Sequence, residues 1–413
     1  MTFLTMSTEE VDQIGVFEKL KQGEIKQGTA ARALSLSVRQ VRRKLKDYRK
    51  EGASSLIHAG RGKPSNRRLN AEVTTKAVGL VKEKYADFGP TFAAEKLLEL
   101  DGVKIGKETL RGLMTEAKLW KPKEKKQGAV HEWRERRACL GELVQLDGSY
   151  HRWFEERGDA CCLLAFIDDA TGHVLWAEFC DGESTENLLL ATKHYLETCG
   201  RPLDLYTDRG GVYKVNRHNP DDERITQYGR ALSELSIGLI HARSPQAKGR
   251  VERLFGTFQD RLVKELRLAD ISAPDEGNRF LREYYLGIFN AKFGVIPKEA
   301  ANLHRSLEGY GLPRILCTKE GRTLQSDHCL SYRKRWLQLE ARQPVVLSRK
   351  EKVTVSQLLD GTIRLSVRGT DLAFRELPER PAKPLREKQP DLRCRGHVPA
   401  PSHPWRRYAT VPI

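Results

Sequence analysis

The sequence predicts a multidomain α+β chain, with helical units at the N-terminus, a central α/β domain and a C-terminal region of short strands. At 413 residues the chain is too long for one ordinary hydrophobic core, and its 39% hydrophobic fraction is enough for several. The apolar spacing is helical at first, alternates between strands and helices from about residue 141, and becomes strand-like near residue 329. We therefore expect domains at 8–68, 70–138, 139–270, 271–320 and 321–377, followed by a basic, disordered tail at 378–413.

The charge is unevenly distributed along the chain. The net charge of +17 predicts a polyanionic partner. Residues 21–68 contain 14 Lys or Arg against 3 Asp or Glu, whereas residues 141–258 contain 13 against 19. A basic segment beside an acidic central region indicates that the basic segment contacts a phosphate backbone and that the acidic region binds cations. Ordinary surface charge for solubility is the alternative.

Several classes of protein are excluded by the composition. No run of 18 apolar residues occurs, and we expect neither a membrane span nor a signal peptide. The eight cysteines include no CxxC pair, which argues against both a disulfide framework and a zinc site. The pattern fits a reducing cytosol, so we expect a cytoplasmic protein.

The N-terminal region contains a short helix, a turn and a second helix between Thr29 and Tyr48. Ser37 and Gln40 have the spacing of a capping box, which places the start of the second helix at Val38. One face of this helix is apolar: Val38, Val41, Leu45 and Tyr48. Another face is basic: Arg39, Arg42, Arg43 and Lys46. A buried stripe beside a row of cations is what a DNA recognition helix requires, so we predict a helix-turn-helix whose basic face contacts DNA.

A second helical unit is predicted between Asn70 and Trp120. Helices over 92–100 and 107–119 would form it, with an apolar stripe of Leu110, Leu113, Met114 and Ala117. Its charge is weaker, so packing and DNA contact are both open for this unit.

In the central domain, two apolar strands each end in a carboxylate. The strand over 142–149 contains Asp147, and the strand that begins near Pro202 ends in Asp208. Between them we predict a two-stranded hairpin, over 160–179, and a helix over 184–198. A helix over 226–235, a strand over 237–241 and a long helix with Glu252 in its first turn follow.

This order of elements matches the ribonuclease-H-like fold, in which the first and fourth strands are parallel neighbours. Asp147 and Asp208 would then lie at adjacent strand ends, and Glu252 would reach them from a helix across the sheet. Three carboxylates at one point repel one another unless divalent cations lie between them. We therefore expect two Mg²⁺ ions at this site, with Mn²⁺ able to substitute.

The motifs around these carboxylates resemble those of insertion-sequence transposases with an integrase catalytic core, most closely the ISNCY group. The resemblance rests on three runs: Val144–Ser149, Tyr206–Gly211 and Ser244–Arg253. It covers roughly residues 20 to 375. It implies that Asp147, Asp208 and Glu252 are the catalytic, metal-binding residues, and that Pro245, Gln246 and Gly249 belong to the family's Pro-Gln-x-x-Gly loop. It further implies a prokaryotic, nucleoid-associated protein.

DNA contacts near the site are expected from Gln246, Lys248, Arg250 and Arg253. Lys248, one helical turn before Glu252, is the best candidate for a contact to an element-end phosphate. The 44 residues between Asp208 and Glu252 (252 minus 208) exceed the spacing usual in the family, and the excess falls in a predicted loop over 214–224.

Other polar residues near the strand ends have simpler interpretations. We interpret Asp168 and Asp169 as hairpin-turn residues, and Asp204 as an exposed or packing residue of its strand. His151 and His241 lie near strand ends, where a structural role is favoured over a general base.

The short strands over 329–374, with a turn at Asp360-Gly361, predict a small β-barrel.

The combined prediction is a DNA transposase that acts as a dimer or larger homo-oligomer on double-stranded DNA. It would bind the terminal inverted repeats of its element, hydrolyse a phosphodiester at each end and join the freed 3′-hydroxyls to target DNA. A DNA-binding regulator with an inactive core, or a stand-alone nuclease, are the alternatives. The first needs an acidic residue to be missing, and the second leaves the helix-turn-helix without a purpose.

Overall fold

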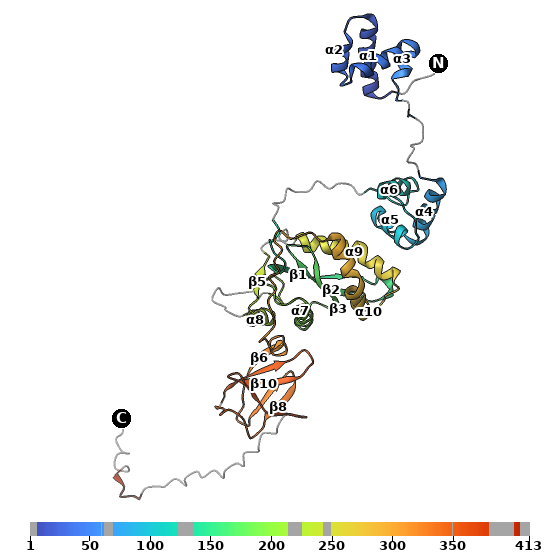
Figure 1. Ribbon diagram of the computed structural model, residues 1–413. Helices are drawn as coiled ribbons and strands as arrows, with labels where there is room; N and C mark the ends of the chain where they lie inside the picture. Colours follow the sequence, from blue (N-terminus) through green and yellow to red (C-terminus); the bar gives the residue numbers. More distant parts are fainter. Residues whose placement is uncertain are drawn as a thin grey trace, which may run out of the picture. The chain divides into compact units, whose positions relative to one another are not determined.

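The computed structural model describes residues 6–58, 60–61, 69–122, 135–213, 225–242, 249–348, 350–379 and 400–404. The chain divides into two compact units, Met1–Lys126 and Gln127–Ile413 (Figure 1). In its described residues the first unit contains helices and no strands, and the second contains the sheets.

The first unit begins with a small helical bundle made of α1 (Thr8–Gln22), α2 (Gln27–Ala33), α3 (Val38–Glu51) and a 3₁₀ turn, η1 (Gly52–Leu56). Its core is formed by side chains such as Phe17, Val41 and Leu45. The predicted capping box is confirmed, because the Gln40 N–H donates to Ser37 Oγ (3.2 Å) and the Ser37 N–H donates to Gln40 Oε1 (2.9 Å). The prediction that Val38 belongs to the buried face is wrong: it is 40% exposed, at the first position of α3, and the buried residues of the helix begin at Val41.

A second bundle follows in the same unit, made of α4 (Ala71–Lys84), α5 (Pro90–Glu99) and α6 (Lys107–Glu116). Its core includes the stacked rings of Phe88 and Phe92, whose centroids are 4.9 Å apart. Leu110 and Met114, from the predicted apolar stripe, are fully buried in this core. The apolar stripe of this helix therefore packs against its own bundle.

The second unit is built on a five-stranded mixed sheet of order β3-β2-β1-β4-β5. The strands are β1 (Leu143–His151), β2 (Cys161–Asp168), β3 (Val174–Cys180), β4 (Asp204–Thr207) and β5 (Gly238–His241). β1 is antiparallel to β2 and parallel to β4, and β4 is parallel to β5. The predicted order of elements and the parallel pairing of the first and fourth strands are thus confirmed.

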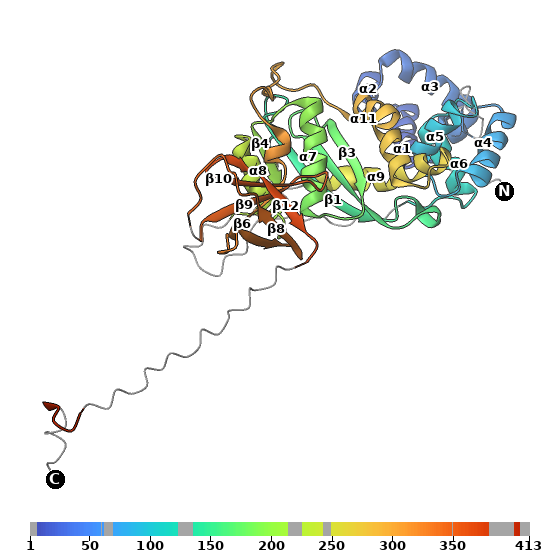
Figure 2. The same cartoon turned by 90° about the horizontal axis from the view of Figure 1, so that it is seen from below.

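Helices cover both faces of this sheet. One face packs against α7 (Thr185–Cys199) and α8 (Gln227–Glu234), through side chains such as Leu146, Leu164 and Leu205 (Figure 2). The other packs against α9 (Gly249–Leu268), α10 (Pro274–Phe280), the π-helical turn η4 (Leu281–Tyr285) and α11 (Leu286–Phe293), through side chains such as Leu163, Ala165 and Phe258. Alternate residues of a strand therefore contact different helical layers.

The C-terminal strands form two sheets around one apolar core. One sheet has the order β11-β10-β9-β6 and the other β12-β8-β7. The strands are β6 (Thr318–Thr323), β7 (Cys329–Tyr332), β8 (Arg335–Leu339), β9 (Lys352–Gln357), β10 (Ile363–Val367), β11 (Thr370–Leu372) and β12 (Phe374–Leu377). The predicted closed β-barrel is not found: among the described residues neither sheet closes on itself, because its first and last strands do not pair. The predicted turn at Asp360-Gly361 is present, with Gly361 at φ +82°.

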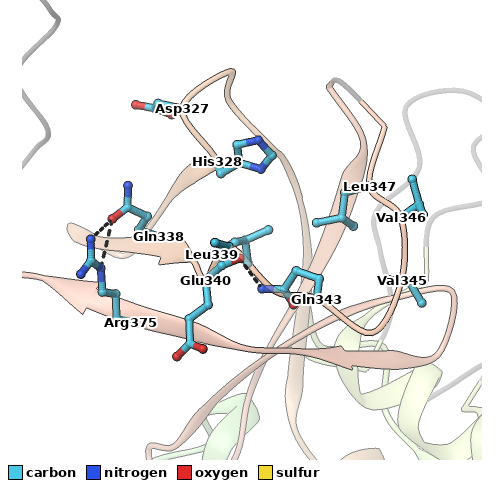
Figure 3. A pocket seen from close by; sticks show the side chains of 11 residues that line it. Asp327, His328, Gln338, Leu339, Glu340, Gln343, Val345, Val346, Leu347 and Arg375 are labelled. Carbon is cyan, nitrogen blue, oxygen red and sulfur yellow. Dashed lines mark hydrogen bonds between the residues drawn. The ribbon is translucent and has the colours of Figure 1, made fainter.

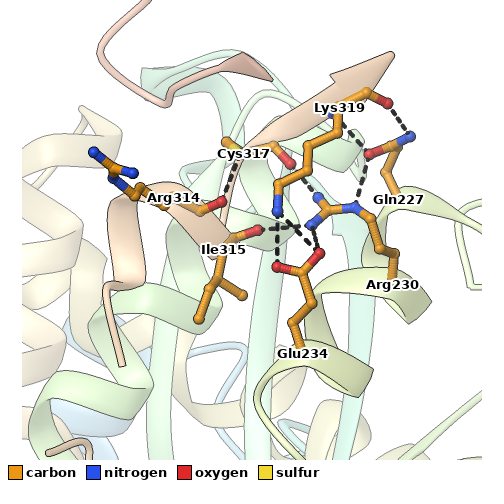
Figure 4. A network of polar contacts seen from close by, with 7 residues as sticks. All are labelled: Gln227, Arg230, Glu234, Arg314, Ile315, Cys317 and Lys319. Carbon is orange, nitrogen blue, oxygen red and sulfur yellow. Dashed lines mark hydrogen bonds and ion pairs between the residues drawn. The ribbon is translucent and has the colours of Figure 1, made fainter. Parts of the chain in front are cut away.

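A polar network joins this strand domain to the central sheet domain (Figure 4). It forms between α8 and the segment around α12 (Leu312–Ile315) and β6. Gln227 exchanges two hydrogen bonds with the backbone of Lys319, at 2.8 and 2.9 Å. Glu234 forms ion pairs with the Lys319 ammonium at 2.8 Å and with the Arg230 guanidinium at 2.7 Å. Arg230 also donates to the carbonyls of Ile315 and Cys317.

We predict that Ser37→Ala loosens the first turn of α3. The substitution removes the acceptor for the Gln40 N–H and should cost about 1 kcal/mol of local stability, or about fivefold faster amide exchange. Hydrogen–deuterium exchange of peptides over 38–51 in the full chain measures this effect. Ser54→Ala is the control, because Ser54 donates to the Glu51 carbonyl and caps no helix start. Equal exchange in both variants would contradict the prediction.

Candidate catalytic site

Asp147 and Asp208 are aligned by the pairing of their strands. β1 pairs with β4 in the register Leu143↔Asp204 to Gln145↔Tyr206. Continuing this register by two residues brings Asp147 opposite Asp208, which directly follows the last residue of β4. Both side chains are half-buried.

The two aspartates face the side of the sheet that α9 covers. Val144, Leu146 and Leu205 belong to the core on the α7 side. Because side chains alternate along a strand, Asp147 points to the opposite side. Its antiparallel partner is Ala165, which belongs to the core that α9 completes.

Glu252 lies in the first turn of α9 and is exposed. Val251, Leu254 and Phe255 bury the neighbouring face of the helix. Gln259, two turns after Glu252 and on the same helical face, donates from Nε2 to Ser149 Oγ at 3.3 Å. Since Ser149 is two residues beyond Asp147, the face of α9 that carries Glu252 runs along β1.

The three carboxylates do not meet at one point. Among the described residues, no group of three His, Cys, Asp or Glu is close enough to hold a metal ion. The carboxylate of Asp208 accepts a hydrogen bond from the Gly210 N–H at 2.7 Å, and His241 Nδ1 lies 3.3 Å from the Asp208 carbonyl oxygen. Strand pairing and helix packing thus bring the three residues to one face, and leave a gap that their side chains do not bridge.

The hairpin-turn aspartates differ from each other. Asp168 accepts hydrogen bonds from the N–H and the hydroxyl of Thr171, at 2.8 and 2.7 Å, and from the Gly141 N–H at 2.9 Å. Its interpretation as a turn residue is confirmed. Asp169 also lies in the turn, but its carboxylate pairs with Arg250 of α9 at 2.7 Å. Sequence reasoning missed this pair, because 81 residues separate its members.

Glu183 is a further carboxylate that the sequence did not single out. It precedes α7, and it accepts a hydrogen bond from the buried Tyr213 hydroxyl at 2.7 Å. Burial, with the nearby charge of Glu183, raises the pKa of Tyr213 well above its usual range, so the phenol remains a donor. A Cβ at Gly148 would lie 3.1 Å from Glu183 Oε1. Glu183 therefore contacts the segments that follow both aspartates.

The predicted DNA-contacting residues have different surroundings. Arg39, Arg43 and Lys46 are exposed on α3, and Arg42, also exposed, donates to Gln27 at 3.4 Å. Arg250 is only 18% exposed in its pair with Asp169. Arg253 is exposed and lines a small cavity of about 170 Å³ with residues that include Arg136, Phe289 and Phe293. Pro245, Gln246, Lys248 and the 214–224 loop lie outside the described residues.

A larger groove, of about 870 Å³, lies in the C-terminal strand domain (Figure 3). His328 and Leu347 are on its walls, and Gln338 accepts two hydrogen bonds from Arg375, at 2.7 and 3.1 Å. None of the predicted site residues that the structure describes lines it. The groove is therefore separate from the carboxylate site.

In the described part of the chain, no helix is long and apolar enough to span a membrane.

Comparisons with solved structures find integrases at low overall similarity. The integrase catalytic core domain of HTLV-2, solved in complex with magnesium in a dimeric form, is 18% identical; it covers 36% of this chain and 91% of its own, with a TM-score of 0.28. A simian T-cell lymphotropic virus intasome in complex with PP2A regulatory subunit B56 gamma is 14% identical; it covers 73% of this chain and 100% of its own, with a TM-score of 0.31. These scores are too low to assign the fold by superposition.

Sequence relatives are much closer. Residues 19–74 match the winged helix-turn-helix family, which agrees with the predicted helix-turn-helix. A Sinorhizobium fredii (strain NBRC 101917 / NGR234) protein named as a transposase, y4bF, is 40% identical over 91% of this chain and 82% of its own length. The transposase for insertion sequence IS1202 of Streptococcus pneumoniae is 29% identical over 95% of this chain and 92% of its own. The chain therefore belongs to the insertion-sequence transposases.

Proposed function

We propose that the chain cuts the ends of its element and joins them to target DNA, with Asp147, Asp208 and Glu252 as the catalytic residues of a ribonuclease-H-like core. The observation that carries this proposal is the continued β1–β4 register, which aligns two aspartates on the face that α9 covers with Glu252. Two aspartates that only formed turns would not be expected to lie opposite each other in the strand register and on the face of the sheet that a glutamate-bearing helix covers.

The donor set fits Mg²⁺. Its members are all carboxylates, which are the hard oxygen ligands that Mg²⁺ prefers, and few of them are needed because substrate and water fill the remaining positions. Two divalent cations held by the three residues would activate the attacking oxygen and stabilise the leaving oxygen, and Mn²⁺ should substitute. Closing the site requires Asp208 to turn from the Gly210 N–H and Glu252 to approach from its exposed position.

The protein's other residues position the reacting DNA. The exposed cations of α3 would hold the terminal inverted repeat, and Arg253, Gln246 and Lys248 would contact the backbone near the cleaved bond. Hydrolysis would free a 3′-hydroxyl, and the same carboxylates would serve its attack on target DNA, without a covalent protein–DNA intermediate. Joining two element ends requires two protomers, so we propose a dimer or larger assembly on DNA inside the bacterial cell.

A regulator with an inactive core remains the competing function. It would bind the element end through the same helices but would catalyse neither cleavage nor joining. The presence of all three acidic residues on one face favours the enzyme.

We predict that Asp208→Asn abolishes strand joining. Removing one carboxylate should lower the joining rate at least about 100-fold in Mg²⁺ or Mn²⁺, because the remaining charges would not retain both cations. The measurement uses the full chain, a labelled duplex of the element's own end and a supercoiled target. Asp147→Asn and Glu252→Gln should behave in the same way.

The matched control is Asp260→Asn, which removes an exposed carboxylate on the same helix as Glu252, where it pairs with Lys264. This variant should join ends at the wild-type rate. End binding by the wild type without cleavage or joining in either metal would establish the inactive regulator instead. Cleavage without joining would favour a stand-alone nuclease.

We predict that Arg43→Ala weakens binding to the element end and reduces its salt dependence. Loss of one phosphate contact should lower the slope of log K against log salt by about one. Fluorescence anisotropy at several salt concentrations measures both quantities. Lys19→Ala, which removes an exposed cation from α1 in the same bundle, is the control. An unchanged slope in Arg43→Ala would show that this face of α3 does not contact phosphates.

A further inference from the structure

The buried carboxylate of Asp169 joins two elements of the candidate site. Asp169 is fully buried, and its Oδ1 accepts from Gln145 Nε2 at 2.8 Å and from the Arg250 guanidinium at 2.7 Å. Its Oδ2 accepts from the Arg137 N–H at 2.9 Å. Gln145 belongs to β1 and Arg250 to the first turn of α9.

Both partners lie two residues before a predicted catalytic residue. Gln145 precedes Asp147 and points to the same face of β1, because side chains two apart in a strand share a face. Arg250 precedes Glu252 in α9. One carboxylate therefore ties the strand that carries Asp147 to the helical turn that carries Glu252.

Apolar packing holds this helical turn on the sheet. Val251 and Leu254 pack on the sheet through apolar contacts, which carry no direction. A charged hydrogen bond is directional, and a buried one excludes competing water. Asp169 also fixes the amide of Gln145, whose Oε1 has no hydrogen-bond partner among the described residues.

We infer that Asp169 is a positioning residue, which holds the first turn of α9 against β1 and so sets the position of Glu252 relative to Asp147. The inference rests on the function proposed above. It also gives Arg250 an internal role in place of the DNA contact expected from the sequence.

Asp169→Asn tests this inference against a close control. The amide keeps the shape of the side chain, but it loses the charge that attracts Arg250 and presents an NH₂ group to the Arg137 N–H. Asp168→Asn is the matched control, because Asp168 is equally buried in the same turn and, among the described residues, its carboxylate accepts hydrogen bonds from Gly141 and Thr171. Arg250→Gln removes the pair from the α9 side.

The readout is the dissociation constant of Mn²⁺, measured by electron paramagnetic resonance on the full chain bound to an element-end duplex. We expect Asp169→Asn and Arg250→Gln to raise it about tenfold, as loss of a group that orients a metal ligand does. Asp168→Asn should leave it unchanged, even where it lowers the melting temperature. The Mn²⁺ concentration for half-maximal joining should rise in parallel, and end affinity should not change.

Three results would overturn the inference. If Asp169→Asn binds Mn²⁺ with the dissociation constant of the wild type, Asp169 has a structural role only. The same conclusion follows if Asp168→Asn changes this dissociation constant equally. Tighter binding of the end duplex by Asp169→Asn would show that Asp169 holds Arg250 away from DNA instead. If the wild type itself does not bind Mn²⁺, the proposed function is contradicted. That result differs from the other three, in all of which the wild type binds Mn²⁺.

Discussion

Three backbone pairs between parallel strands, from Leu143↔Asp204 to Gln145↔Tyr206, determine where the proposed catalytic aspartates lie. A slip of one residue would turn every side chain of one strand to the other face and would move Asp208 away from Asp147. The apolar residues prevent that slip, because Val144, Leu146 and Leu205 must all enter the core under α7. The burial of three aliphatic side chains on one face thus fixes the carboxylates on the other.

Distant segments strengthen this arrangement through buried polar contacts. Arg201 is almost fully buried, donates to the carbonyls of Leu235 and Ser306 at 2.6 and 2.9 Å, and lies 4.1 Å from the centroid of the Tyr310 ring. A buried charge such as Arg201 needs its donors matched, so it favours one arrangement of the segments over alternatives. The more exposed network of Arg230 and Glu234 also joins α8 to the strand domain.

Local signals allowed much of this structure to be predicted. The capping box at Ser37 and Gln40 depends on residues three apart, and the apolar run that begins β1 lies within the nine residues of that strand. The pair of Asp169 with Arg250 has no local signal. The hairpin between Tyr332 and Arg335 turns on Arg333 and Lys334, at φ 45° and 67°. Gly or Asn at these positions would have predicted this turn from the sequence. Barrel closure failed as a prediction for a related reason, since short strands specify pairing and not whether the sheet closes.

The proposed site would need a positioning contact beside its three acidic residues. Three carboxylates repel one another, so the chain's own electrostatics give no force that draws Glu252 toward Asp147 and Asp208. The apolar stripe of α9 holds the helix on the sheet through contacts that have no preferred direction, so a small rotation of the helix would move Glu252 relative to the aspartates. Asp169 contacts Gln145 and Arg250, which lie two residues before Asp147 and Glu252 respectively. These contacts would limit that rotation without adding to the repulsion among the three carboxylates. The pair of Asp169 and Arg250 meets this requirement, because its charges cancel and its carboxylate is buried away from the exposed face that carries Glu252.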